Sequence, residues 1–562
     1  MKIFGLLACA AMLAMPVANM AATYYISPGG NNNANGQTEA TAVKTFAKAF
    51  SLMTAGDELI LLDGMYSQAA GTGYISMGEA NSAQIPSGTV SRPTVVRAKT
   101  PGAVKVIGAL LVGTKTRKDS YIKIQGITFI GMSSLYNTSY VTVKDCGFYD
   151  ISKSADMTFS IGTNDHQMGN SYNLIEDTWI WGSNRGIAIN YRSEYNVWRR
   201  VMIRSDGCNT APCLGEGNPN HGIVVYDSAN ISLQNVIVVD RILGGGSPYG
   251  DFSTAQHTDG MAYGNNEWLG CLSLNSEDIG FYLEPDEVSL MPAHRLRDCV
   301  AWDATGIGIN LAMAGSNDVR NSTVRVKSGH SGIRIASNLK DGTLTNVVVL
   351  GNAIYGINSA VAPSYANVFG SWTTSAFTQT SCTSSCLTTN PLADGSIKYV
   401  TRIEPGSPLK GSGAQSADYG ANIVFRYGID GTRYGDPGYN TLTTTTLWPW
   451  PNEARIKQEM CAETGVSRGF CAKSSLTEYI WTYLGNPVPP DFTSNAPPST
   501  MNPCDINRDG VISAADVTAA RDQALGISAC STGDLEPNGR CDVIDVQRVI
   551  NTVLGQQCRT GN

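Results

Sequence analysis

Charge is scarce in this chain. Only 15% of its 562 residues are Asp, Glu, Lys or Arg, only 5 are His, and the net charge of -7 leaves no excess of cations. A basic stripe for nucleic acid is therefore not expected. Beyond the first 22 residues no run is long and apolar enough to cross a bilayer, so we expect no membrane span.

The N-terminus has the pattern of an export signal. The stretch "MKIFGLLACAAMLAMPVANMAAT" opens with Lys2, runs apolar to Val17 and ends in the small residues Ala21 and Ala22. This pattern predicts a cleavable signal peptide over residues 1–22. We therefore expect a secreted or extracellular protein, free or associated with the cell surface.

Glycine is abundant, with 59 residues, and it recurs in a repeat. The anchors stand in "NRGIAIN", "NHGIVVY", "TDGMAYG", "DIGFYLE", "ATGIGIN", "HSGIRIA" and "AIYGINS". Alternating apolar residues that return every two dozen or so residues predict a mainly β fold, a parallel β-solenoid over residues 23–375. We expect an irregular extension over 376–485, a Pro-rich linker over 486–503 and a separate C-terminal module over 504–562.

Aligning the anchors assigns a face to each residue of a coil. The first and third positions after each glycine are expected to point inward, and the second and fourth outward. The inward set is Ile187, Ile189, Ile223, Val225, Met261, Tyr263, Phe281, Leu283, Ile333 and Ile335. A second strand predicts a small inward column of Cys146, Thr178, Val201, Val236, Cys271, Cys299, Ser322 and Val347. A column of turn-stabilising residues consists of Asp145, Asp177, Asn235, Asp298, Asn321 and Asn346.

The cysteines fit an exported chain. Without Cys9 in the signal an odd number remains, and three buried thiols in the inward column leave ten that can pair. The close couples are Cys208/Cys213, Cys382/Cys386 and Cys461/Cys471. The last four, Cys504, Cys530, Cys541 and Cys558, allow three pairings.

The segment before the repeat closes the open edge of the solenoid. It contains a Gly/Asn turn, a short amphipathic helix around Thr45 to Met53 and the strand sequence "GDELILLDGMY". This opening resembles that of exported right-handed parallel β-helix proteins, among them polysaccharide lyases, over about residues 23–372. The resemblance implies a right-handed parallel β-helix with an N-terminal helical cap, and assigns no reaction.

The C-terminal module carries two calcium-type loops. The first, "DINRDGVISAAD", places oxygen ligands at Asp505, Asn507, Asp509, Ser513 and Asp516, with the carbonyl of Val511 at position seven. A helix follows. The second loop, "DLEPNGRCDVID", repeats the pattern and precedes another helix. Its ligands are Asp534, Glu536, Asn538, Arg540 at the position corresponding to Val511, Asp542 and Asp545.

Two loop–helix units of this kind resemble a type I dockerin, a module that docks onto cohesins. The resemblance implies a small α-helical domain that binds Ca²⁺ and a cohesin-type partner. The recognition pair before the last ligand is Ala514/Ala515 in one loop and Val543/Ile544 in the other, not the Ser-Thr of many dockerins. A calcium-stabilised stalk or anchor without a cohesin is the alternative.

The residues before the glycine anchors predict the functional site. Three successive anchors are preceded by Arg185, His221 and Asp259, which would form one exposed column. Long loops flank these coils and would wall a groove. Other outward residues expected nearby are Asn190, Tyr226, Tyr282, Glu284, Arg204, Asp206, Asp240 and Arg241.

A groove along stacked coils suits a linear polysaccharide, and two chemistries are open. In β-elimination Arg185 would neutralise a uronate carboxylate, His221 would take the C5 proton, Tyr226 or Tyr282 would protonate the leaving oxygen and Asp259 would orient His221. Hydrolysis would instead use Asp259 with Glu284 or Asp240. We favour a polysaccharide lyase. The alternatives are a non-catalytic carbohydrate-binding or adhesive surface protein, a glycoside hydrolase and a uronate epimerase.

Overall fold

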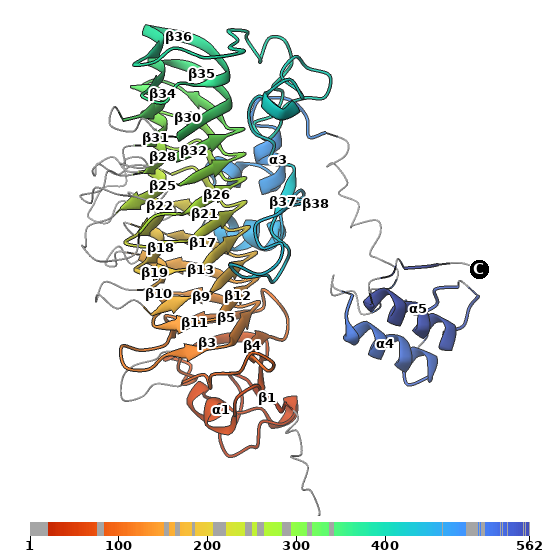
Figure 1. Ribbon diagram of the computed structural model, residues 1–562. Coiled ribbons are helices and arrows are strands. Elements are labelled where there is room, and N and C mark those ends of the chain that lie inside the picture. The colour runs from red at the N-terminus through yellow and green to blue at the C-terminus, as the bar shows by residue number, and fades with distance from the viewer. Residues whose placement is uncertain are drawn as a thin grey trace, which may run out of the picture. The chain divides into compact units, whose positions relative to one another are not determined.

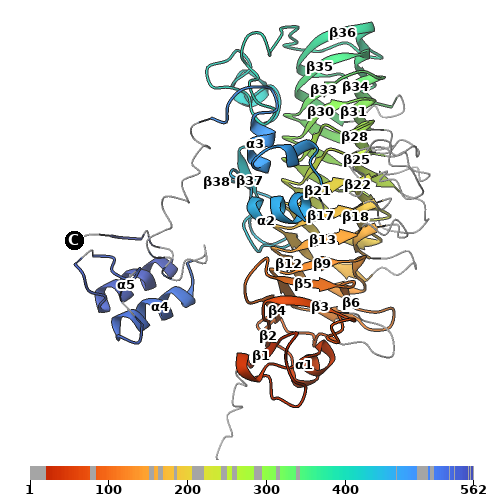
Figure 2. The same ribbon diagram turned by 180° about the vertical axis from the view of Figure 1, so that it is seen from behind.

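Most of the chain consists of short parallel strands stacked coil on coil, as the computed structural model shows (Figures 1 and 2). It describes residues 21–75, 84–150, 157–162, 169–182, 186–205, 221–241, 250–255, 263–283, 294–311, 317–336, 342–463 and 465–489. In the tail it describes 504, 506, 512–528, 530, 532–536, 538–554, 556 and 558–560. The chain forms two compact units, Met1–Pro487 and Val488–Asn562.

Three parallel ladders run the length of the first unit, the arrangement of a parallel β-helix. The first ladder contains β1 (Thr23–Ile26), β2 (Glu58–Leu61), β4 (Thr94–Ala98), β8 (Ile122–Gln125), β12 (Thr142–Lys144), β16 (Leu174–Glu176), β20 (Val197–Arg199), β23 (Ser232–Gln234), β26 (Glu267–Leu269), β29 (Arg295–Arg297) and β32 (Asn317–Arg320). The second contains β3 (Gly64–Ser67), β5 (Val104–Ile107), β9 (Thr128–Ile130), β13 (Gly147–Asp150), β17 (Trp179–Gly182), β21 (Met202–Ser205), β24 (Ile237–Val239), β27 (Leu272–Leu274), β30 (Val300–Ala304) and β33 (Thr323–Val326).

The third ladder faces away from the C-terminal extension. It contains β6 (Leu111–Val112), β10 (Ser133–Leu135), β14 (Met157–Ile161), β18 (Gly186–Tyr191), β22 (His221–Tyr226), β25 (Gly250–Ala255), β28 (Ile279–Leu283), β31 (Ile307–Leu311) and β34 (Ser331–Ile335). The long strands β35 (Gly342–Ser359) and β36 (Ser364–Thr378) complete the ladders. A short ladder links the third to the first and contains β7 (Asp119–Ser120), β11 (Thr138–Ser139), β15 (Asn170–Ser171) and β19 (Ser193–Glu194).

The N-terminal cap is confirmed. Helix α1 (Phe46–Leu52) lies at the N-terminal end of the coils, near β1 (Figure 1). The side chain of Thr45 caps it by accepting a hydrogen bond from the backbone N–H of Lys48 at 3.2 Å. Phe46 and Phe50 face the core, where Phe46 contacts the ring of Tyr66 with centroids 5.4 Å apart. The helix thus covers apolar surface that the first coil would expose.

Two predicted columns are confirmed. The small inward column lies directly before the second-ladder strands, and its members from Cys146 to Val347 are at most 1% exposed. The Asp/Asn column one residue earlier has positive φ angles of 48–55° at all six positions. Asn and Asp tolerate this left-handed conformation better than other residues with a side chain, which explains their recurrence at the turn.

The register predicted for the third ladder is partly wrong. His221 is paired with Gly186 and Ala188 with Ile223, so the step between these coils is one residue shorter than assumed. The next strand is β25, not the segment around Gly260, and Gly280 aligns with Gly308 rather than Gly306. As a result, Ala188 and Asn190 point inward, whereas Ile189, predicted inward, joins Tyr191 and Val224 in a small outer cluster.

Steric crowding at a corner explains which glycines align. A Cβ atom on Gly308 would lie 2.1 Å from Cγ1 of Val324, and one on Gly332 would lie 2.2 Å from Cγ1 of Val349. At these two coils the corner between the second and third ladders therefore has no room for a side chain. The sequence pattern alone does not distinguish these glycines from the neighbouring Gly186 and Gly306.

The extension packs back along the first and second ladders. It contains β37 (Phe425–Tyr427), β38 (Leu442–Thr446), α2 (Glu453–Lys457), which continues into a π-helical turn (Gln458–Ala462), and α3 (Leu476–Trp481). Shorter 3₁₀ turns cover Glu39–Thr41, Ala414–Ser416 and Gly469–Ala472. The buried Arg199 fastens the extension by donating to the carbonyls of Ile429 and Tyr439 at 2.8 and 2.9 Å.

The cysteines pair as expected where the structure describes them. Disulfides join Cys382–Cys386 and Cys461–Cys471, and the tail has the pairs Cys504–Cys558 and Cys530–Cys541. Cys146, Cys271 and Cys299 are buried thiols. Cys208 and Cys213 lie outside the described residues, as does most of the predicted signal. Within the described part of the chain, no helix is long and apolar enough to cross a membrane.

The described part of the tail unit forms two helices of equal length. Helices α4 (Ala514–Ala524) and α5 (Val543–Val553) both begin with a capping box, formed by Ser513 with Asp516 and by Asp542 with Asp545. Their small shared core is Cys504, Ile506, Ala520, Leu535 and Val549.

Candidate functional site on the third-ladder edge

Polar residues gather where the chain turns from the second ladder into the third. We call this row the third-ladder edge and define it as His221, Arg241, Glu277, Asp278, Thr305, Lys327 and His330. Backbone hydrogen bonds hold it in order, because Gly306 N–H donates to the Asp278 carbonyl at 2.8 Å and His330 N–H donates to the Gly306 carbonyl at 2.9 Å. The edge therefore extends over five successive coils.

His221 is the first residue of β22 and stands partly exposed on this edge. The strand register places Gly250 beside it on the next coil and Ile279, which follows Asp278, on the coil after that. At one strand spacing per coil, His221 and Asp278 are about 10 Å apart along the edge. The predicted base thus shares a surface with an acidic residue that the repeat pattern did not single out.

Three of the predicted catalytic residues, Arg185, Asp259 and Glu284, lie outside the described residues, so their roles stay predictions. The column that was to unite them with His221 assumed a register that the structure does not have, since Gly186 occupies the position paired with His221. The prediction that Asn190 points outward near the site is wrong. It is fully buried inside the coil, where its Oδ1 accepts from Trp198 Nε1 at 3.3 Å.

The two tyrosines proposed as acids lie at different places. Tyr226 is at the other end of β22 from His221, about 16 Å away along the strand. It stacks on Tyr191 with centroids 4.6 Å apart, and burial raises its pKa. Tyr282 is a half-buried outward residue of β28, between Ser253 and Asn310 in register. Tyr226 and His221 therefore do not serve the same bond.

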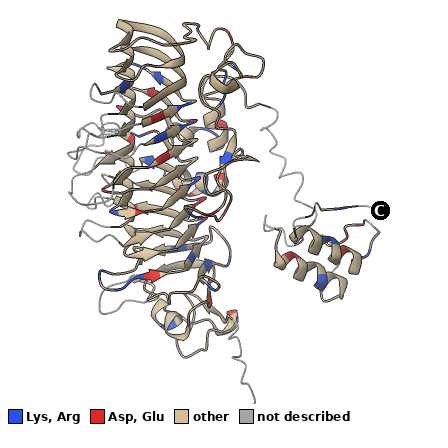
Figure 3. Ribbon diagram, viewed as in Figure 1, with Lys and Arg blue, Asp and Glu red and all other residues tan. Residues whose placement is uncertain are grey.

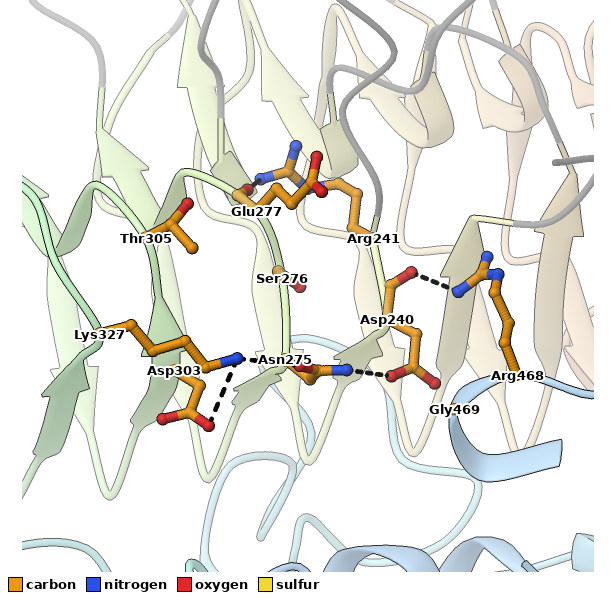
Figure 4. A pocket seen from close by; sticks show the side chains of 10 residues that line it. All are labelled: Asp240, Arg241, Asn275, Ser276, Glu277, Asp303, Thr305, Lys327, Arg468 and Gly469. Carbon is orange, nitrogen blue, oxygen red and sulfur yellow. Dashed lines mark hydrogen bonds and ion pairs between the residues drawn. The ribbon is translucent and has the colours of Figure 1, made fainter. Parts of the chain in front are cut away.

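A pocket of about 290 Å³ opens on the edge (Figure 4). It spans four successive coils and is closed on one side by the extension. Its lining combines three cations with three carboxylates and small polar groups. The residues are Asp240, Arg241, Asn275, Ser276, Glu277, Asp303, Thr305, Lys327, Arg468 and Gly469.

Lys327 is the most exposed cation of the pocket, with a side chain that is 45% exposed. Its ammonium reaches back over two coils, to Oδ1 of Asn275 at 3.4 Å and Oδ2 of Asp303 at 3.6 Å (Figure 4). These distances are long for charge-assisted hydrogen bonds, so the ammonium keeps donors available for a ligand.

Arg241 is held rigidly behind the edge. Its Nε donates to Oδ1 of the buried Asp251 at 2.5 Å, and its Nη2 donates to the Glu277 carbonyl at 2.6 Å. Asp251 stands in the corner position that is glycine in later coils, and small Ser273 opposite makes room for it. The pair fixes the loop that presents Glu277.

Asp278 has the features of a proton-transfer group. Burial raises the pKa of its carboxyl, while the nearby Arg241 lowers it to a smaller extent. Its backbone N–H donates to Thr305 Oγ1 at 2.7 Å, and among the described residues its buried Oδ2 has no hydrogen-bond partner. A carboxyl of this kind at a pocket rim is a candidate general base or acid.

Asp240, predicted as one carboxylate of a hydrolytic pair, is engaged elsewhere. It is 2% exposed, and its oxygens accept hydrogen bonds from Asn275 Nδ2, Tyr479 OH and Phe470 N–H at 2.8, 2.6 and 3.1 Å. Two of these donors belong to the extension. Asp240 thus positions the extension against the coils, although it also lines the pocket.

Four residues of this region were not predicted from the sequence: Glu277, Asp278, Lys327 and Arg468. The first two follow "LSLN" at the end of a second-ladder strand, and Lys327 holds a comparable place in "VRVKSG". A search of strand ends in addition to glycine anchors would have found them. Arg468 lies far along the chain, so only the fold brings it to the edge. Charges of both signs are scattered over the coils, without a stripe of one sign among the described residues (Figure 3).

In the second loop of the tail, the predicted ligands form a hydrogen-bonded turn. Asp534 accepts from the backbone N–H groups of Asn538 and Gly539 at 3.0 and 2.8 Å, and Gly539 has φ 79° at the sharp turn. Asp545 accepts from Leu535 N–H at 2.8 Å, and Glu536 pairs with Arg548 at 2.6 Å. Among the described residues no group of three or more His, Cys, Asp or Glu is arranged to hold a metal.

The first loop is described only in part. Asp505, Asn507, Asp509 and Val511 lie outside the described residues, whereas Ser513 and Asp516 form the capping box of α4. The predicted recognition pairs are on the surface. Ala514 and Ala515 are exposed, and Val543 and Ile544 are 76% and 49% exposed.

Comparison with known proteins gives fold-level likenesses. No protein-family model and no curated protein matches the chain. Among solved structures, the pectate lyase Pel9A is similar at 17% identity and TM-score 0.41, over 71% of this chain and 95% of that one. A mannuronic-acid-specific family 6 polysaccharide lyase from human gut microbiota is similar at 11% and 0.36, over 66% and 84%. A GH136 lacto-N-biosidase from Eubacterium ramulus is similar at 10% and 0.28, over 65% and 68%.

Proposed function

We propose that the third-ladder edge binds an acidic polysaccharide and cleaves it by β-elimination. The observation that carries the proposal is the pocket itself, which Lys327 and Arg468 line, together with Asp278, which directly follows the lining residue Glu277 and has a carboxyl whose pKa burial raises. Elimination from a uronate needs a cation at the carboxylate and a base at C5, and this edge supplies both.

The residues take the following roles in this proposal. Lys327 pairs with the uronate carboxylate, which stabilises the charge that develops when the C5 proton leaves. Asp278 accepts that proton, the C4–O bond breaks, a C4=C5 double bond forms, and the same carboxyl returns the proton to the leaving oxygen. His221, two coils away, contacts a neighbouring sugar unit. A separate acid such as Tyr226 is then not required.

The test is ultraviolet absorbance of unsaturated uronate ends when the mature protein meets a panel of acidic polysaccharides, with calcium and with chelator. We expect a signal on one polymer, a loss of at least about a hundredfold in Asp278→Asn and a smaller loss in His221→Ala. A larger loss in His221→Ala than in Asp278→Asn would instead make His221 the base. Glu194→Gln, on another ladder, is the matched acid control.

Other outcomes of the same assay would identify the other functions. New reducing ends without absorbance would make the protein a glycoside hydrolase. Exchange of the C5 proton with solvent without cleavage would make it an epimerase. Binding without either change would make it a carbohydrate-binding or adhesive protein, and would overturn the catalytic proposal.

We propose that the tail is a dockerin-like module that binds Ca²⁺. Its two capped helices of equal length support a duplicated unit, and the left-handed turn at Gly539 is the sharp turn such a loop needs. Ca²⁺ would be held by Asp505, Asn507, Asp509, Val511, Ser513 and Asp516 in one loop and by Asp534, Glu536, Asn538, Arg540, Asp542 and Asp545 in the other. Calcium should raise the melting temperature of the tail, and Asp534→Ala should reduce that rise.

A cohesin-type partner and export complete the proposal. The exposed Val543 and Ile544 offer an apolar contact surface, so Val543→Asp with Ile544→Asp should abolish capture by a cohesin panel while calcium binding persists. Four disulfides among the described residues support an oxidising, extracellular location. If no cohesin captures the wild-type chain, the tail serves as a stalk or anchor.

A further inference from the structure

Four tyrosines stack along the first coils in a row that neither the fold nor the proposed reaction requires. Their ring centroids are 4.8, 5.1 and 5.1 Å apart, with interplanar angles of 6, 4 and 11°. Each ring follows a strand of the short ladder, one ring to a coil. We call this row the tyrosine ladder and define it as Tyr121, Tyr140, Tyr172 and Tyr195.

The backbone under the tyrosine ladder is unfavourable for tyrosine. All four residues have positive φ, between 55 and 58°. This left-handed conformation suits Gly, Asn and Asp, and is uncommon for bulky side chains. At the same turn of the next two coils the chain has Asn230 and Asn265, with φ 55 and 53°. The turn itself therefore has no need of an aromatic residue.

The phenol groups of the ladder are available to a ligand. The four side chains are only partly buried, and among the described residues none of the four hydroxyls has a hydrogen-bond partner. Buried tyrosines elsewhere do find partners, since Tyr66 donates to the Leu62 carbonyl at 2.7 Å. Bulky residues in a costly conformation, with unused polar groups in a regular row, indicate a binding role.

The extension adds a cation and closes one end of the row. Arg433 lies beside the ladder, with Nη2 2.8 Å from Thr142 Oγ1 and 3.5 Å from the Tyr140 carbonyl. The edge of Tyr434 contacts the ring of Tyr195, with centroids 5.3 Å apart. Arg433 thus places a positive group beside the tyrosine ladder, where it can pair with a carboxylate.

We propose that the tyrosine ladder is a docking surface for a linear acidic polysaccharide, separate from the third-ladder edge. Each coil offers one phenol hydroxyl, and the spacing of the rings is about the length of one sugar unit in an extended glycan. Successive hydroxyls donate to and accept from successive sugar units, and Arg433 pairs with a uronate carboxylate. The choice of an acidic glycan rests on the proposed function, whereas the ladder and its free hydroxyls do not.

The test removes the hydroxyls and keeps the stack. In Tyr121→Phe/Tyr140→Phe/Tyr172→Phe the rings remain, so the melting temperature should stay as in the wild type. Retardation in affinity gels containing polygalacturonate or alginate should fall at least tenfold for the polymer that retards the wild type. Turnover of a trisaccharide of that polymer should not change, because it reaches only the third-ladder edge.

Two further variants separate binding from stability. Tyr140→Asn/Tyr172→Asn introduces the residue that later coils use, so the fold should persist while polymer retardation falls at least tenfold. Tyr365→Asn makes the same substitution at another positive-φ tyrosine (φ 49°) outside the ladder and should leave retardation unchanged. Retardation equal to wild type in the Phe variant would overturn the proposal, as would a lowered melting temperature with intact binding in the Asn variant. Gel binding is scored without turnover, so failure of the lyase proposal would be seen separately.

Discussion

The β-helix unit and the tail are stabilised by different means. In the large unit, stacked coils bury a continuous apolar core, and this core allows ion pairs such as Arg200–Asp177 and Arg241–Asp251 to be buried beside it. Among its described residues the tail has five core residues, and it relies on two disulfides. A small unit cannot bury enough apolar surface to fold securely, so covalent links take over. Buried charge is therefore expected to matter in the first unit and cross-linking in the second.

The largest effect should come from a buried carboxylate of the first unit. Glu459 accepts hydrogen bonds from Thr128 Oγ1 and Trp179 Nε1, both at 2.8 Å, and pairs with Arg455 at 3.2 Å. Glu459→Ala leaves Arg455, whose side chain is 17% exposed, over the Trp179 ring without its counter-ion, and leaves the buried donors of Thr128 and Trp179 without their acceptor, which should cost about 3–5 kcal/mol. Calorimetry of the full chain would show a lowered transition for the first unit and an unchanged one for the tail.

A matched control lies four residues further along. Glu463 pairs with Lys105 at 2.6 Å. Their side chains are 31% and 26% exposed, whereas that of Glu459 is 3% exposed. Glu463→Gln should therefore cost below about 1 kcal/mol. If Glu459→Ala cost no more than this control, buried charge would not be what fastens the extension to the coils.

The next effect concerns the cross-link of the tail. Cys504–Cys558 joins residues 54 apart, so Cys504→Ser/Cys558→Ser should destabilise the tail by about 2–5 kcal/mol and leave the first unit unaffected. Limited proteolysis of the full chain would show faster cleavage within residues 504–562. Cys382→Ser/Cys386→Ser, whose loop spans 4 residues, should have a much smaller effect. Equal effects would contradict the contrast between the units.

The sequence predicted the repetitive parts of this molecule better than its site. The column from Cys146 to Val347 could be predicted because small residues recur at one inward position. The register of the third ladder could not be predicted, because both Gly186 and Gly222 stand near the corner. Only the contact with the second ladder determines which glycine occupies the corner position. Asp278 was missed because the residue directly before the glycine of "DIGFYLE" is Ile279, and Arg468 because it lies outside the repeat. Arg185, Asp259 and the ligands of the first calcium loop remain predictions.

The last effect should appear as a pH dependence. Asp298 is buried at the junction of coil and extension, where it accepts from Tyr427 OH at 2.5 Å and Asn422 N–H at 3.4 Å. Burial raises the pKa of its carboxyl to about 6, and these hydrogen bonds lower it in part. Between about pH 4 and pH 6 the folded chain keeps a proton that the unfolded chain releases, so the stability falls as the pH rises through this window.

The full loss of stability from this group is about 3 kcal/mol and is complete above about pH 6. Asp298→Asn removes the titrating group and keeps its shape. The free energy of unfolding, measured with denaturant, should therefore fall less between about pH 4 and pH 7 in this variant than in the wild type. Other buried carboxyls, such as Asp251, titrate in both proteins and cancel in the difference. Asp394→Asn, exposed on the extension, should follow the wild-type profile. If wild type and Asp298→Asn declined in parallel, the proton on Asp298 would not contribute to holding coil and extension together.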